Sequence, residues 1–243
     1  EPFFIAWTTT PWTLPSNTAL AMGANIDYVA VQTYNPYTHD KVTVVCAKVL
    51  MGSLFNAKAK DLALDEYKND GKNIPHKVVG EWKGSDLAGM EYEQLFPWGN
   101  PGEGAFRVIL GDFVTTEDGT GIVHIAPTFG ADDSRVATAN KVPALLMIDK
   151  EGNQRPMVDL TGRYFRLEDL DPTYVAENMN ADLYKEYAGR YVKNAYDATL
   201  TEKDRTLDID LSILLREQNR AFNVAKQVHN YPHCWRTDKP VLY

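Results

Sequence analysis

The sequence predicts an α+β fold with a β-barrel-like core of mostly antiparallel strands, decorated with helices. Many short runs of alternating or β-branched residues are separated by turn residues, and few segments have helical periodicity. Of the 243 residues, 44% are hydrophobic and 11% are aromatic, which is typical of a globular chain with a sizeable core. We therefore expect a single domain over residues 1–243, in which a helical part at about 165–230 forms a subdomain.

The strand predictions begin with residues 3–7, which lead into a turn rich in threonine and proline. Residues 28–34 and 41–47 alternate or carry β-branched side chains, and the Asn35-Pro36 turn between them predicts a hairpin. The remaining strands are predicted at residues 78–82, 106–115 and 144–149, and a short strand is predicted between the turn at Gly119 and Pro127.

Helices are predicted mainly in the second half of the chain. Asp132 fits the N-cap and Asp133 the first residue of a helix, because acidic side chains suit the positive end of the helix dipole. Asp171-Pro172 predicts the start of a helix that continues to about residue 186. The apolar spacing over residues 212–228 predicts a second long helix.

Charge and cysteine content narrow the class of protein. The net charge is −8, but residues 185–243 carry ten basic and eight acidic residues, so this part is +2 and the rest is −10. We interpret the charged residues at 185–243 as an ordinary solvated surface that binds a polyanion weakly. Cys46 and Cys234 lie far apart without a pairing pattern, and no apolar run is long enough to cross a bilayer, which favours a cytoplasmic protein. The sequence has no cluster of metal ligands, so we expect that the chain binds neither a metal ion nor a cofactor.

The most informative segment is residues 7–17, which read WTTTPWTLPSN. Side chains alternate along a strand, so Thr8 and Thr10 are expected to project together and Thr9 to the other face. Because the following proline restrains the backbone, two neighbouring hydroxyls there can hold a water or a polar ligand. Threonine is also a common β-former, so this segment alone does not establish a site.

A second motif lies more than a hundred residues later, where residues 119–133 read GTGIVHIAPTFGADD. It predicts a tight turn, a short strand and a loop that runs into a helix. His124 would lie near the end of the strand and Asp133 just beyond the loop, so both side chains can face one cleft. Taken singly, each could equally be structural.

Together the two motifs resemble the editing domain of isoleucyl-tRNA synthetases over essentially the whole chain. The related valyl and leucyl enzymes have Arg-Pro after the second threonine, whereas this chain has Thr10-Pro11 followed by Trp12. The chain departs from the common bacterial pattern at Thr128-Phe129, where Gly-His is usual. It has no His-x-Gly-His or Lys-Met-Ser-Lys-Ser signature, so ATP-dependent amino-acid activation is not expected of it.

The resemblance implies hydrolysis of the ester that joins valine to the 3′ end of tRNA(Ile), with valyl-adenylate as a second substrate. Asp133 would bind the α-ammonium group, and His124 would admit valine and exclude isoleucine. The remaining residues implied to contact the substrate or line its pocket are Thr8, Thr9, Thr10, Trp7, Trp12 and Asn17. The expected partners are tRNA(Ile) carrying valine and the rest of the parent synthetase, with a monomer that does not bind membranes.

Two other functions fit the same residues. One is a valyl- or leucyl-type editing domain that removes a different amino acid, which the Thr10-Pro11-Trp12 run disfavours. The other is a module that binds aminoacyl-tRNA without hydrolysing it, which the intact threonine row and Asp133 disfavour. An unrelated serine hydrolase is disfavoured because the chain has no Gly-x-Ser-x-Gly motif.

Overall fold

The structure, a computed structural model, describes residues 1–201, 203–226 and 231–242. The strands are β1 (Pro2–Phe4), β2 (Ala19–Met22), β3 (Asp27–Tyr34), β4 (Lys41–Ala47), β5 (Lys77–Lys83), β6 (Arg107–Leu110), β7 (Ile122–Ile125), β8 (Met147–Ile148) and β9 (Gln154–Arg155). The α-helices are α1 (Met51–Leu54), α2 (Gly84–Leu87), α3 (Ala131–Ala139), α4 (Pro172–Asn178), α5 (Ala181–Tyr184) and α6 (Leu207–Glu217). The 3-10 helices are η1 (Pro11–Ser16), η2 (Lys48–Leu50), η3 (Ala57–Ala59), η4 (Leu64–Glu66), η5 (Leu167–Asp169) and η6 (Asn194–Tyr196).

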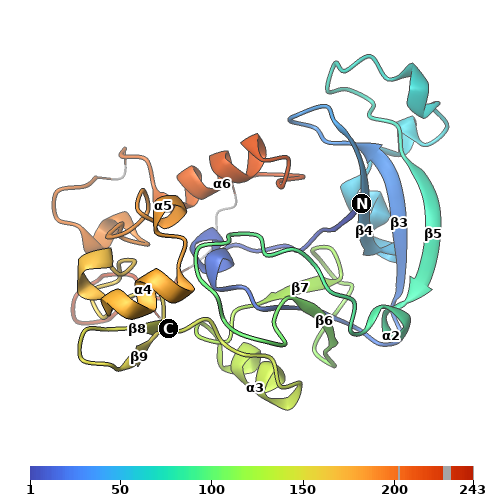
Figure 1. Ribbon diagram of the computed structural model, residues 1–243. Helices are drawn as coiled ribbons and strands as arrows, with labels where there is room; N and C mark the ends of the chain where they lie inside the picture. Colours follow the sequence, from blue (N-terminus) through green and yellow to red (C-terminus); the bar gives the residue numbers. More distant parts are fainter. Residues whose placement is uncertain (202, 227–230, 243) are drawn as a thin grey trace.

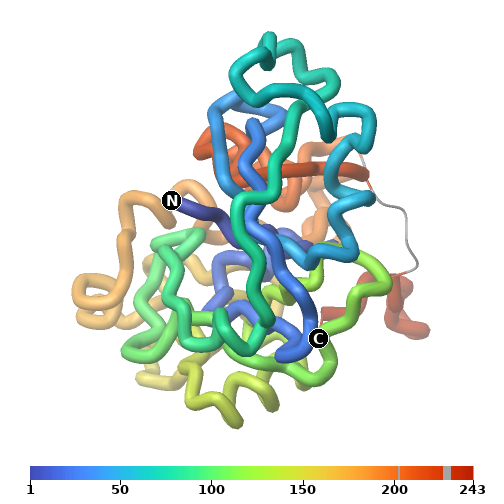
Figure 2. The backbone as a smooth tube through the Cα atoms, turned by 90° about the vertical axis from the view of Figure 1, so that its right-hand side faces the viewer, coloured from blue at the N-terminus to red at the C-terminus, as the bar shows by residue number. Residues whose placement is uncertain are grey.

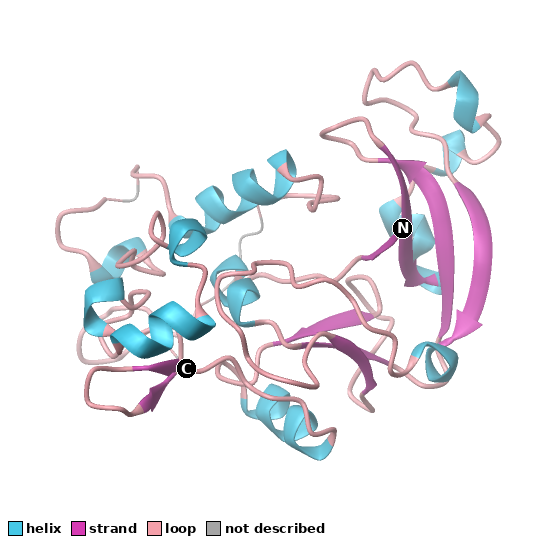
Figure 3. Cartoon of the chain, viewed as in Figure 1, coloured by secondary structure: helices cyan, strands magenta, loops and turns pink. Residues whose placement is uncertain are grey.

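The largest sheet has the strand order β1-β4-β3-β5 and lies at one side of the molecule, while α4 and α5 lie at the other (Figures 1 and 3). Its centre is the predicted hairpin of β3 and β4, which pairs in register from Tyr28 opposite Ala47 to Tyr34 opposite Lys41. β1 adds to β4 in parallel. The chain leaving β1 therefore carries the threonine motif from this sheet toward the middle of the molecule.

A second sheet has the order β6-β2-β7, with β2 antiparallel to β7. All four residues of β2 are buried, as expected for a central strand covered on both faces. The sheet is tied to the first one by Tyr28, whose hydroxyl donates to the Gly121 carbonyl at 2.6 Å. Gly121 has φ +75°, and a Cβ there would lie 2.4 Å from Cβ of Ala47, so this close approach requires glycine.

The C-terminal part is built on a core of aromatic residues, and Trp98 stacks on Tyr187 with ring centroids 4.8 Å apart. α6 contributes Leu211 and Leu215 to this core. In Figure 1 the helix lies between the α4–α5 region and the large sheet, and in Figure 2, which is viewed from the side of that sheet, it lies behind the sheet. α6 thus connects the aromatic core of the C-terminal part with the end of the large sheet.

The α+β class is confirmed. Four of the six strand pairings in the described sheets are antiparallel. The three sheets remain separate within the described residues and do not close into one barrel. No helix in the described ranges combines the length and the apolar character that crossing a membrane requires.

Three predicted strands are shorter than expected. Of residues 3–7, the strand β1 ends at Phe4, and Trp7 forms an isolated bridge to Val123. The strand predicted at 106–115 ends at Leu110, and the one predicted at 144–149 pairs only over Met147–Ile148. An apolar run predicts burial, but the length of a strand depends on the partner that pairs with it.

Two predicted helices also differ. The helix from Pro172 breaks at Met179, which is extended, and Asn180 then caps α5 by accepting from the Leu183 amide. The helix predicted at 212–228 begins earlier, at Leu207, and ends at Glu217. The chain turns at Asn219, which has φ +58°. Residues 227 and 228 of that prediction lie outside the described residues.

Candidate active site

The threonine motif forms an irregular turn between β1 and η1. The Thr8 hydroxyl accepts from the Thr10 amide at 3.0 Å, and the two hydroxyl oxygens lie 3.3 Å apart. Thr8 and Thr10 are half-buried, while Thr9 is exposed. The prediction that Thr8 and Thr10 project together is therefore confirmed. Thr9 was predicted to face the other way, but it lines the same cavity as the other two, because the segment is an irregular turn and not a strand. Pro11 then begins η1, and the Thr13 amide closes its first turn on the Thr10 carbonyl at 3.0 Å.

His124 is held by hydrogen bonds at both ring nitrogens. Asn17 Nδ2 lies 2.8 Å from Nδ1, and it also donates to the Ala19 carbonyl at 2.8 Å. Because a carbonyl can only accept, Asn17 presents its amide nitrogen here, and His124 Nδ1 must accept. The ring proton is then on Nε2, which donates to the Thr13 hydroxyl at 3.1 Å. Burial lowers the pKa of His124 to about 4, so the ring is neutral near pH 7.

Asn17 lies behind His124 and not on the cavity wall, which corrects the prediction that it lines the pocket. Its side chain is buried, and its Oδ1 accepts from the Tyr92 hydroxyl at 2.5 Å. Its Nδ2 contacts the Ala19 and Ile125 carbonyls and His124 Nδ1, so it holds β2, β7 and the histidine ring together. Asn17 therefore holds the His124 ring in place and does not face the cavity.

Asp133 lies in the first turn of α3, which starts at Ala131 after the extended residue Gly130. The predicted N-cap at Asp132 is thus wrong by two residues, because the loop after Pro127 is shorter than expected. Asp133 Oδ2 accepts from the Ala126 amide at 2.8 Å, and Oδ1 accepts no hydrogen bond within the described part of the chain. Burial is the main cause that raises the pKa of Asp133.

A cavity of about 330 Å³ brings these groups together. It is lined by all three threonines of the motif, by His124 and by Asp133. The other residues that line it were not predicted from the sequence, and they are Thr13, Phe113, Thr115, Asp118, Ala126, Phe129 and residues 119–123. Of these, Thr13 could have been found, since it follows Thr10 at the spacing of one 3-10 turn.

The two tryptophans of the motif take different places. Trp7 is 46% exposed and lies on the cavity rim, where Gly119 also lines the cavity. Trp12 is 2% exposed and belongs to the aromatic core of the C-terminal part. The prediction that it lines the cavity is therefore wrong. Its ring meets Phe129 edge to face, with centroids 5.0 Å apart. Alternation along the motif stops at Pro11, which turns the second tryptophan inward.

The two cysteines and His76 lie outside the cavity. The described ranges contain no group of three or more His, Cys, Asp or Glu side chains that could hold a metal ion. Cys46 is buried in the large sheet and is a free thiol, as is Cys234. His76 is buried and stacks on Phe55 at 5.0 Å, as expected for a structural residue. The described cavity thus offers hydroxyls, the carboxylates of Asp118 and Asp133 and one neutral imidazole.

The fold is of the CP1 type, as found in aminoacyl-tRNA synthetases. A solved structure described as GlLeuRS-CP1 is similar in fold, with a TM-score of 0.51 over 93% of this chain and 84% of that one. The two sequences are 16% identical, so the likeness concerns the fold alone. No protein-family profile matches the chain.

The chain belongs to the isoleucine–tRNA ligase family. It is 63% identical over 242 residues to the isoleucine–tRNA ligase of Bacteroides fragilis and 64% identical over 244 residues to that of Porphyromonas gingivalis. Each match covers all of this chain but 21% and 22% of the relative. The chain therefore spans about a fifth of the length of the curated relatives it matches.

Proposed function

We propose that the cavity hydrolyses the ester between valine and the 3′-terminal adenosine of tRNA(Ile), and that it also accepts valyl-adenylate. The observation that carries this proposal is the convergence of the threonine row, His124 and Asp133 on one cavity of about 330 Å³. These groups come from two motifs that are more than a hundred residues apart in the sequence. Each has a role that follows from its surroundings.

Asp133 is the proposed partner of the α-ammonium group. Its Oδ2 is occupied by the Ala126 amide, which leaves Oδ1 for a ligand in the cavity. A half-buried carboxylate whose pKa is raised by burial has lost part of its hydration. A charge-assisted hydrogen bond from an ammonium group would restore that stabilisation.

His124 is the proposed size filter. A hydrophobic pocket that fits the larger of two amino acids binds one that lacks a methylene less tightly by only about 1–3 kcal/mol of free energy. Isoleucine against valine is the standard illustration of this limit. A second site must therefore admit valine and exclude isoleucine, which needs a wall that does not move. The two hydrogen bonds at Nδ1 and Nε2 prevent the ring from rotating. They also occupy its lone pair, so the histidine is not free to act as a general base.

The threonines are proposed to contact the substrate and orient the attacking water. A threonine hydroxyl is a poor base, so the rate gain has to come from positioning and electrostatics. The linked hydroxyls of Thr8 and Thr10, with Thr13 within 3.4 Å of Thr10, offer both donors and acceptors toward the cavity. A hydroxyl of the terminal ribose would assist proton transfer.

The remaining partners follow from this function. We propose that the chain works as a monomeric unit within its parent synthetase in the cytoplasm, and that the rest of the enzyme supplies most of the tRNA affinity. In the C-terminal part, Arg190 pairs with Asp210 and Arg220 with Glu93, so several basic groups are already neutralised. This agrees with weak binding of tRNA by the chain alone.

The test is to measure binding of non-hydrolysable valyl and isoleucyl esters of adenosine, together with deacylation of valyl-tRNA(Ile). Selective binding of the valyl compound with release of valine from tRNA is the expected result. Binding without release would favour the module that only retains aminoacyl-tRNA. Preference for threonyl or another aminoacyl compound would favour the valyl- or leucyl-type domain.

A further inference from the structure

The peptide groups on either side of Trp12 are held by two side chains from the distant C-terminal part. The Trp12 amide donates to Asp208 Oδ1 at 2.9 Å, and the Trp12 carbonyl accepts from the Tyr164 hydroxyl at 2.6 Å. Asp208 lies in the first turn of α6, and Tyr164 is fully buried in the aromatic core. Both backbone groups of one residue are thus fixed by parts of the chain more than 150 positions away.

Trp12 occupies the middle of the turn that presents the threonines to the cavity. It lies between Thr10 and Thr13, and Pro11 before it has a restrained φ and no amide hydrogen. The Thr13 amide and hydroxyl both donate to the Thr10 carbonyl, at 3.0 and 2.9 Å. A shift of the Trp12 backbone would therefore move the hydroxyls of Thr10 and Thr13 together. Neither Asp208 nor Tyr164 lines the cavity.

The carboxylate of Asp208 is placed where it would be unfavourable without a specific partner. Burial raises its pKa to about 6, while Lys193 and the Trp12 amide act in the opposite direction. The start of α6 also favours a negative charge, since the first amides of a helix are not bonded within it. The Trp12 amide is thus a good donor for a carboxylate in this environment.

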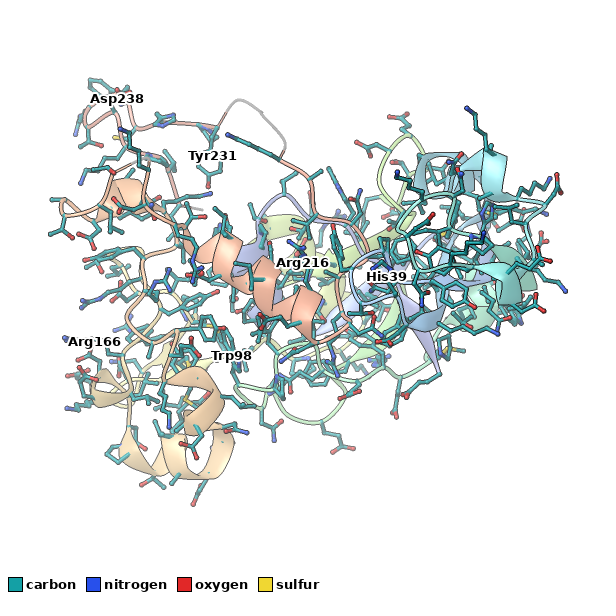
Figure 4. All side chains as sticks on the ribbon, turned by 90° about the horizontal axis from the view of Figure 1, so that it is seen from above. His39, Trp98, Arg166, Arg216, Tyr231 and Asp238 are labelled. Carbon is teal, nitrogen blue, oxygen red and sulfur yellow. The ribbon has the colours of Figure 1, made fainter. Side chains whose placement is uncertain are left out.

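α6 is also anchored at its other end, so Asp208 is carried by a helix that cannot easily shift. Beyond the helix, Asn35 Nδ2 donates to the Ala221 carbonyl at 2.9 Å, and the Thr38 hydroxyl donates to Asn219 at 2.8 Å. The Arg216 guanidinium lies 4.3 Å from the ring centroid of Tyr37. Figure 4 shows Arg216 on the side of α6 that faces the hairpin end carrying His39.

We propose that Asp208 and Tyr164 are positioning residues that set the geometry of the threonine row through the backbone of Trp12. This inference rests on the proposed function, because it assigns the C-terminal part a role in the hydrolysis carried out by the cavity. It predicts that loss of either bond reduces turnover more than ground-state binding, since the ammonium partner Asp133 is left in place and His124 keeps its hydrogen bond from Asn17.

The first test compares two matched tyrosines. Tyr164 and Tyr184 are both fully buried in the same core, and each hydroxyl donates to a backbone carbonyl at 2.6 Å, that of Trp12 and that of Phe165. Tyr164→Phe is expected to lower kcat for valyl-tRNA deacylation at least about tenfold with little change in KM, because small misplacements of reacting groups are costly. Tyr184→Phe, measured at equal folded fraction, is expected to stay within about twofold of the unaltered chain.

The second test uses rescue at Asp208. Asp208→Asn keeps an oxygen that can accept from the Trp12 amide, whereas Asp208→Ala removes it. The asparagine variant is expected to retain most of the turnover, and the alanine variant to lose at least about tenfold. Equal loss in both would show that the charge, and not the hydrogen bond, matters, and would overturn the positioning role of this residue.

A readout that does not need activity separates the inference from the proposed function. Hydrogen exchange of the Trp12 amide is expected to be slow in the unaltered chain and in Tyr184→Phe, and faster in Asp208→Ala than the global unfolding rate allows. Normal turnover in Tyr164→Phe, or an unchanged Trp12 exchange rate in Asp208→Ala, would overturn the inference alone. Failure of the unaltered chain to release valine, with slow exchange intact, would instead overturn the proposed function and with it the role in turnover.

Discussion

The two sides of the cavity differ in how completely their polar groups are bonded. On one side, both ring nitrogens of His124 are engaged, by Asn17 and Thr13, and Asn17 is held in turn by Tyr92. On the other side, Asp133 has one bond to a backbone amide and an oxygen directed to no protein donor within the described residues.

This difference matches two kinds of recognition. Discrimination by size requires a wall that does not yield, and a ring with both nitrogens bonded in a buried network meets that requirement. Recognition of a charge requires a group that is positioned but still has bonding capacity for the ligand. The cavity thus combines one saturated side and one unsaturated side, and the following variants test each in turn.

The largest effect is expected for Asp133→Asn. Asparagine can still accept from the Ala126 amide, so the start of α3 is kept while the charge is lost. Loss of a charge-assisted hydrogen bond of about 1.5–3 kcal/mol should lower kcat/KM for valyl-tRNA by more than tenfold and up to about 100-fold. Asp132→Asn is the matched control, because Asp132 is exposed and pairs with Arg135 outside the cavity. Equal activity of the two variants would contradict the assignment of Asp133.

The next largest effect is a change of selectivity in His124→Ala. Removing the ring opens the saturated wall, so isoleucyl-tRNA should become a substrate, and the preference for the valyl ester should fall by about 30-fold. Deacylation of both esters by the same preparation measures this ratio. His76→Ala removes another buried histidine that lies outside the cavity, and it should leave the ratio unchanged. Continued rejection of isoleucine by His124→Ala would show that the size filter lies elsewhere.

A smaller loss of activity is expected when the carboxylate of Asp133 is displaced and not removed. A Cβ at Gly130 would lie 3.1 Å from Cγ and 3.2 Å from Oδ1 of Asp133, while the extended backbone there tolerates any residue. Gly130→Ala should therefore shift the carboxylate by a few tenths of an ångström and lower kcat/KM about tenfold. Gly52→Ala adds the same methyl group where nothing lies within 4 Å, and its activity should match the unaltered chain.

The smallest net effect concerns pH and stability. The folded pKa of His124, about 4, is below the value of about 6.5 in an unfolded chain, so its contribution is complete above pH 6.5 and is lost toward pH 4. The folded pKa of Asp208, about 6, is raised, so its contribution is lost as the pH rises from about 4 to 6. Each shift corresponds to about 3 kcal/mol, and the two oppose each other over the same range.

The two contributions can be separated by urea unfolding between pH 4 and 7. His124→Gln should lose less stability on acidification than the unaltered chain, because the group that must become charged is gone. Asp208→Asn should lose more, because the opposing contribution is gone. Identical pH dependence in all three proteins would contradict the buried, neutral state of His124.

The main features of the site could be predicted from local sequence. The short strand with His124 near its end, the turn at Gly119–Gly121 and the paired hydroxyls of Thr8 and Thr10 each depend on neighbouring residues. The places of Trp12 and Asn17 could not be predicted in the same way. Both are buried by partners from other sheets and helices, and a motif does not state which of its residues face inward.

The sequence by itself determined the α+β class, the hairpin of β3 and β4 and five of the residues that line the cavity, which are Thr8, Thr9, Thr10, His124 and Asp133, since alternation and turn chemistry act over a few residues. The tertiary structure decided which strands pair, where α6 begins and ends, and which groups saturate His124 but not Asp133. These outcomes depend on contacts such as Tyr92 with Asn17 and Asp208 with Trp12, which join positions 75 and 196 residues apart. Contacts of that range have no local signature, because their free energy arises only when the whole chain has packed.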